Sequence, residues 1–216
     1  CRRFARVRAR RECFVASEVS IANRALTKLG AGLITALTDD DPKAVAMNGA
    51  FAAVRDAELR RRRWKFSLAR ASLPALSAAP AFGYSYAYQV PDGFLRLLQV
   101  GDFDLAAPLN DEFSFAPTAL YSLEGRQILT SLTAPLKIRY VQQVADVSQW
   151  DAAFQEAIAA RLAYECCYRI TQSTEREDRC LRDYNLAVRE ASRANALESA
   201  AERASDDTWL MSRAGR

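Results

Sequence analysis

Apolar residues in the first part of the chain recur at three- and four-residue steps, which predicts helices. The stripe Val19, Ala22, Leu26 and Leu29 favours a helix over residues 17–29, between a serine N-cap and glycines at 30 and 32 that can end it. A second helix is expected to begin at Asp39-Asp40-Asp41-Pro42 and to run to the arginines at 60–63. Aspartate caps followed by proline are a strong start signal, and capping explains the three acids more simply than a metal site does.

The pattern changes to alternation between residues 84 and 142, which predicts strands. Tyr84, Tyr86, Tyr88 and Val90 alternate with small or polar residues before a Pro-Asp-Gly turn. Further strands are expected over 95–103, 119–123, 127–132 and 136–142. The preceding stretch, from 74 to 80, is rich in Ala, Ser and Pro and is expected to be a loop.

Helical spacing returns in the last third of the chain. Residues 149–172 contain neither Pro nor Gly, and residues 175–204 continue as a second long helix with one narrow stripe of small residues. Outside that stripe the second helix is mostly polar, so it would bury little within its own chain. A helix of this kind is marginal alone and is expected to pack against another subunit.

The order of these segments predicts an α+β fold, a helical bundle with long C-terminal helices and an inserted small antiparallel β-domain. The helical bundle is assigned to residues 17–72 and 148–204, and the β-domain to 82–143. Residues 1–16 are a basic N-terminal extension, which we expect to be disordered or foreign to a natural start near Ser17. Residues 205–216 form a C-terminal tail.

Charge is distributed unevenly along the 216 residues. The formal net charge is +4, but residues 1–16 alone carry six arginines and one acid, so the remainder is close to −1. The body is therefore not expected to be a basic nucleic-acid-binding domain. No apolar run reaches the roughly 18 residues that a membrane span needs, so no membrane partner is expected.

The residue types narrow the possible chemistry. Histidine is absent, which excludes imidazole-based triads and histidine-ligated zinc. The five cysteines form no CxxC pair, and no glycine-rich phosphate loop is present, so neither cofactor nor metal is expected. Glu58, Glu156 and Glu165 are the carboxylates considered for catalysis, but no pair has the contrasting settings that an acid and a base require. The chain is predicted not to be an enzyme.

Several segments in this order resemble the tail tubular protein A family, the head-to-tail adaptors of short-tailed bacteriophages. The resemblance covers nearly all of residues 17–204 and rests on order and spacing together. The segments are Ser17-Glu18-Val19-Ser20-Ile21-Ala22-Asn23-Arg24-Ala25-Leu26-Thr27-Lys28-Leu29-Gly30, Ile34-Thr35-Ala36-Leu37, Val54-Arg55-Asp56-Ala57-Glu58-Leu59-Arg60, Trp64-Lys65-Phe66-Ser67-Leu68-Ala69, Phe82-Gly83-Tyr84-Ser85-Tyr86-Ala87-Tyr88-Gln89-Val90-Pro91, Tyr140-Val141 and Trp150-Asp151-Ala152-Ala153-Phe154.

The resemblance implies a structural virion protein of the tail or neck, assembled in the host cytoplasm. Its members form a twelve-copy ring that joins the portal protein to the tail nozzle protein, with tail fibres as a further class of partner, around a channel through which double-stranded DNA passes during ejection. A head-to-tail interface closes into a ring when its rotation permits, and long under-buried helices would supply one. A near-neutral body also suits a conduit that must not hold phosphates.

Two groups of residues are candidate contact sites. Arg60, Arg61, Arg62 and Arg63 exceed what a helix end requires, and Trp209, Leu210 and Met211 form an apolar cluster that could dock on the portal. Two alternatives remain open at this point. One is a nucleic-acid-binding module that uses Arg2 to Arg11 with Arg60 to Arg63, and the other is a phage cell-wall hydrolase that depends on a carboxylate such as Glu58.

Overall fold

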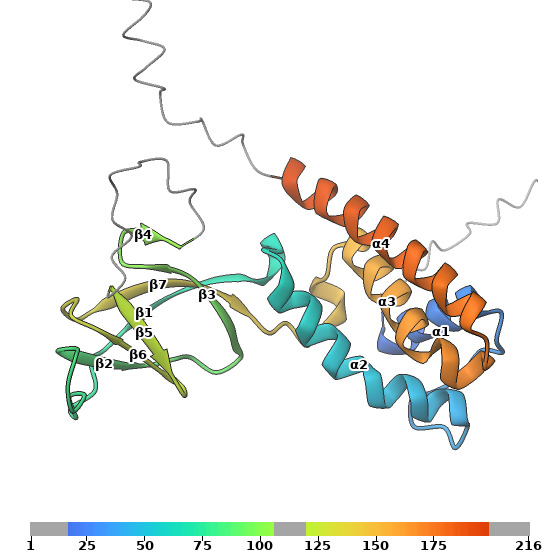
Figure 1. Cartoon of the computed structure of the whole chain (residues 1–216), viewed down its shortest axis with the longest axis horizontal. Coiled ribbons are helices and arrows are strands. Elements are labelled where there is room, and N and C mark those ends of the chain that lie inside the picture. Colours follow the sequence, from blue (N-terminus) through green and yellow to red (C-terminus); the bar gives the residue numbers. More distant parts are fainter. Residues whose placement is uncertain (1–16, 106–119, 199–216) are drawn as a thin grey trace, which may run out of the picture.

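The computed structural model describes residues 17–105 and 120–198, and it shows a helical unit beside a β unit (Figure 1). The four α-helices are α1 (Glu18–Leu29), α2 (Pro42–Arg61), α3 (Ala152–Thr171) and α4 (Thr174–Leu197), with short 3-10 turns at Lys65–Ser67 and Val147–Gln149. The strands are β1 (Leu68–Leu73), β2 (Tyr86–Gln89), β3 (Phe94–Val100), β4 (Phe103–Asp104), β5 (Tyr121–Glu124), β6 (Gln127–Thr130) and β7 (Leu136–Gln142). The predicted α+β class is confirmed.

Helix ends lie where the capping signals place them. Ser17 accepts a hydrogen bond from the backbone N–H of Ser20, and Gly30 ends α1 in the left-handed conformation with φ 68°. Asp41 caps α2 by accepting from the backbone N–H of Lys43, with Pro42 in the first turn. Gln172 adopts φ 52° at the end of α3, and Ser173 caps α4 directly afterwards.

Two antiparallel sheets make up the β unit. One has the strand order β1-β7-β3-β4 and the other has β2-β6-β5. Their shared core contains Tyr88, Ile128 and Leu136, together with Val100 and Ile138, all of them buried. This core is separate from that of the helices.

The helical core is built around aromatic side chains. Phe154 of α3 packs edge-on against Trp64 at a centroid distance of 4.8 Å and against Trp150 at 5.2 Å. Both indole N–H groups donate to backbone carbonyls, Trp64 to Glu58 and Trp150 to Val144. Buried aromatic rings with satisfied polar ends fix the junction between the two halves of the helical unit.

Two expectations about the elements need correction. The helical unit is expected to run to residue 72, but residues 68–73 form β1, which pairs along its whole length with β7. The strand expected over 95–103 is two strands, β3 and β4, separated by a turn in which Gly101 adopts φ 57°. Helix α4 ends at Leu197, and residues 199–204 of the predicted helix lie outside the described part of the chain.

Candidate interaction surfaces

The arginine cluster at the end of α2 makes contacts within the molecule. Arg60 donates to the backbone carbonyl of Leu95 in β3. Arg62 donates from Nη1 to the hydroxyl of Ser192 in α4 at 2.7 Å. These two arginines connect the end of α2 to different elements, while Arg60 and Arg61 remain exposed.

Asn195 holds the last turns of α4 against the segment that follows α2. Its amide nitrogen donates to the backbone carbonyl of Arg63 at 3.0 Å, and its amide oxygen accepts from the backbone N–H of Lys65 at 2.9 Å. One side chain thus satisfies both polar groups of a short extended segment. The backbone around Arg63 is therefore an internal support for α4.

Arg61 contributes to a polar network that includes Glu58. Its guanidinium donates to the hydroxyl of Tyr184 at 2.7 Å, and that hydroxyl donates in turn to a carboxylate oxygen of Glu58. Arg161 lies over the Tyr184 ring at 5.1 Å. Burial is the largest cause of a raised Tyr184 pKa, and the hydrogen bond to Glu58 and its charge add to it.

The position of Glu58 does not suit a cell-wall hydrolase. The residue is only 2% exposed, and it lies between α2 and α4 rather than in an open cleft. A polymeric substrate could not reach such a carboxylate without displacing α4. The other two carboxylates form ion pairs near the surface. Glu156 pairs with Arg24 and Lys28, and Glu165 pairs with Arg161.

The outward side of α4 is a second candidate surface. Only Cys180, Tyr184, Val188 and Ala191 are buried among its 24 residues. Leu186 and Leu197 are 58% and 86% exposed, and a spacing of eleven residues is slightly more than three helical turns, so both lie on one side. Figure 1 shows α4 along the outside of the helical unit, packed on α3.

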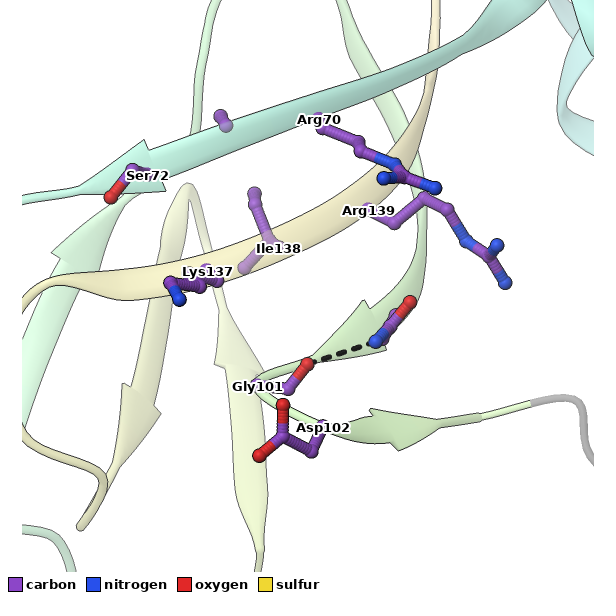
Figure 2. A pocket seen from close by; sticks show the side chains of 9 residues that line it. Arg70, Ser72, Gly101, Asp102, Lys137, Ile138 and Arg139 are labelled. Carbon is purple, nitrogen blue, oxygen red and sulfur yellow. Dashed lines mark hydrogen bonds between the residues drawn. The ribbon is translucent and has the colours of Figure 1, made fainter.

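The third candidate is a groove of about 480 Å³ on the four-stranded sheet (Figure 2). Arg70 and Ser72 of β1 line it, together with Lys137 and Arg139 of β7 and the turn that contains Gly101 and Asp102. Sequence reasoning missed this groove because β1 was not predicted. The alternation of Arg70 and Ser72 with Ala69, Ala71 and Leu73 was the signal that could have revealed the strand.

The remaining predictions concern the two ends of the chain, metal binding and membrane-spanning helices. Trp209, Leu210 and Met211, like Arg2 to Arg11, lie outside the described residues. Within the described ranges, no group of His, Cys, Asp and Glu side chains could hold a metal ion. Nor does any helix of residues 17–105 or 120–198 have the length and apolar character to cross a membrane.

No model of a known protein family matches the chain. No curated protein matches it either.

Proposed function

We propose that this protein is a structural subunit of a head-to-tail adaptor ring in a short-tailed bacteriophage. The ring would join the portal to the tail nozzle and surround part of the path of the ejected DNA. The tail fibres of the phage would be further partners. The order of segments that resembles the tail tubular protein A family suggests these partners and a copy number of twelve.

The observation that carries this proposal is the exposed side of α4. Helix α4 has 24 residues but buries four of them, and its outward side presents Leu186 and Leu197 to solvent. A neighbouring subunit that covers these two leucines would remove their apolar surface from water, which favours association. The opposite side of such a neighbour would extend the contact head to tail, which is the geometry of a ring.

The polar contacts of α4 support the same reading. Tyr184, Ser192 and Asn195 fix the helix to α2 and to the segment after it, so its outward side has a defined orientation. A surface of fixed orientation can repeat around a ring without a large ordering cost on association. The chemistry of an enzyme is not part of the proposal, and neither is a cofactor.

Mutation of the two leucines tests ring formation. The full chain is expected to form rings, seen by negative-stain electron microscopy and by light scattering on a sizing column. Leu186→Glu with Leu197→Glu is expected to give folded monomers with the helix content of the wild type, since both side chains are exposed in the single chain; their thermal midpoint should fall only by what ring assembly contributes. The matched control is Leu123→Glu, an exposed leucine of β5, which should leave the rings intact.

Two results would contradict the proposal. The first is a wild-type protein that stays monomeric at high concentration and also in the presence of portal. The second is a set of rings that survives both leucine substitutions.

Truncation after Ser205 provides a separate test of the C-terminal tail. Loss of Trp209, Leu210 and Met211 should weaken portal docking and leave the ring itself intact.

A further inference from the structure

The outer face of the four-stranded sheet collects cations from neighbouring strands. Strand pairing places Arg70 opposite Arg139 and Ser72 opposite Lys137. Because side chains alternate along a strand, these four lie on the face away from Ile138, which is buried in the β core. Figure 2 shows the Arg70 and Arg139 guanidinium groups extending in the same direction from adjacent strands.

The groove over this face has the size and the polarity of an anion site. It encloses about 480 Å³, and Arg70, Lys137 and Arg139 outnumber its one acid, Asp102. Both Arg70 and Lys137 are exposed. Neutral groups complete the lining: the Ser72 hydroxyl and the amide of Gln99, which donates to the carbonyl of Gly101 at 3.0 Å.

The lining favours phosphate over the carboxylates of a protein partner. Protein interfaces depend on buried aromatic and apolar anchors, and none of the residues that line the groove is aromatic. Arginine, lysine, serine and glutamine are instead the side chains that contact phosphate oxygens. Two of the three acids in the α1–α2 turn of a second copy already have partners, since Asp39 accepts from Thr35 and Ala36 and Asp41 caps α2.

We propose that this groove binds the phosphodiester backbone of nucleic acid without sequence preference. The body is close to neutral as a whole, but this face is locally cationic, so at this one place it departs from the expectation of a conduit that does not hold phosphates. Arg70 and Lys137 supply the main charge contacts toward the two ends of the groove, and Ser72 and Gln99 are the neutral groups of the lining that can donate hydrogen bonds to phosphate oxygens. A lining without aromatic rings provides no platform on which bases could stack, so contact is limited to the backbone. The inference does not rest on ring formation, because the groove lies in the β unit and the proposed subunit contact lies on α4.

A double substitution isolates the groove in the full chain. Arg70→Gln with Lys137→Gln removes two exposed cations, and Arg126→Gln with Arg182→Gln removes two others that lie outside the groove. Binding of a short fluorescent DNA duplex is measured by anisotropy between about 50 and 200 mM salt. The groove variant should bind roughly tenfold more weakly at low salt, and its salt slope should fall by about 2. The control variant should match the wild type.

Lysine footprinting locates the contact independently of residues 1–16, which are the same in all variants. The chain has only four lysines, Lys28, Lys43, Lys65 and Lys137. Duplex DNA should protect Lys137 from acetylation and leave Lys43 as reactive as before. Arg70→Gln should reduce the protection of Lys137.

Competitors distinguish the source of the anion. The proposal expects unlabelled duplex to displace the probe, and inorganic phosphate or polyglutamate at matched charge to be far weaker. Displacement by phosphate as effective as by duplex would assign the groove to a free anion, and equal displacement by polyglutamate would assign it to an acidic protein; either result overturns the proposal. Unprotected Lys137, or unchanged binding by the groove variant, also overturns it. Rings formed by that variant would leave the adaptor proposal untouched.

Discussion

At the scale of single residues, the most informative group is the polar network between α2 and α4. Glu58 is buried, and one of its carboxylate oxygens has no hydrogen-bond partner, whereas the other accepts from Tyr184. A buried carboxylate is costly unless partners stabilise it. Tyr184 and the nearby Arg61, whose nitrogen lies 3.8 Å from the bonded oxygen, meet part of that cost.

Glu58→Gln should therefore lower stability. The amide keeps an acceptor oxygen for Tyr184 but loses the charge that strengthens this hydrogen bond. The expected loss is about 1–3 kcal/mol in the free energy of unfolding, measured by chemical denaturation. Glu124→Gln, at an exposed site on β5, is the control and should show no measurable change. Equal stability of both variants would mean that the network contributes nothing.

Two buried thiols predict a decline in stability at high pH. Burial is the largest cause that raises the pKa of Cys166 and of Cys180 from 9.0 to about 11, with smaller contributions from Glu165 and Cys167 respectively. The unfolded chain loses these protons first, so their contribution is complete below pH 9 and is lost as the pH rises toward about 11.

The measurement is the free energy of unfolding at steps from below pH 9 to about pH 11. Cys166→Ala with Cys180→Ala should flatten the decline in this window, whatever its effect on stability at neutral pH. Tyr184, whose pKa is also raised, stays in both proteins as a common background. Identical slopes in the two proteins would exclude the thiols as the cause.

At the scale of elements, the first and last turns of α4 are held against the rest of the molecule in different ways. Its first turns contribute Cys180 and Tyr184 to the core, but past Ala191 the side chains of Ser192 and Asn195 take over as polar links. The last turns of this helix thus rest on hydrogen bonds more than on apolar burial.

Asn195→Ala should loosen the end of α4 selectively. The substitution leaves the carbonyl of Arg63 and the N–H of Lys65 without their side-chain partner, which costs about 1–3 kcal/mol if water cannot replace it. Hydrogen exchange, followed by mass spectrometry, should become faster in the last turns of α4 and remain unchanged in α1. Glu190→Ala, on the exposed side of the same helix, is the control. Equal exchange in the two variants would contradict this role of Asn195.

The elements also differ in how far the sequence alone predicts them. Helices were predictable because their signals are local: Ser17, Asp41-Pro42 and Gly30 act within one turn. Strand β1 is harder to predict because its alternating pattern covers only residues 68–73 and follows directly on helical residues, so the local signal is weak without the pairing to β7. The basic groove depends on that pairing register, which brings Arg70 and Arg139 together across a large separation in sequence. No local pattern contains that information.

At the scale of the whole molecule, the helical unit and the β unit have separate cores, so we expect them to differ in their free energies of unfolding. Trp64 and Trp150 are buried in the helical core, and Ile138 lies in the β core. Ile138→Ala should destabilise the β unit by roughly 2–5 kcal/mol and leave the tryptophan emission of the folded protein unchanged. Hydrogen exchange should increase in β3, β6 and β7 well before it does in α3. Equal loss of protection in both units would show that they unfold as one.

The pairing of β1 with β7 also has a consequence for engineering, because it allows the β unit to be replaced. Leu68 and Val141 are direct partners, so the chain leaves the helical unit and returns to it at neighbouring points. Facing residues of an antiparallel pair lie only about 5 Å apart, a gap that a very short tether can close. The intervening segment is therefore a cassette, replaceable in principle by a foreign hairpin or by a reporter grafted at the same two points.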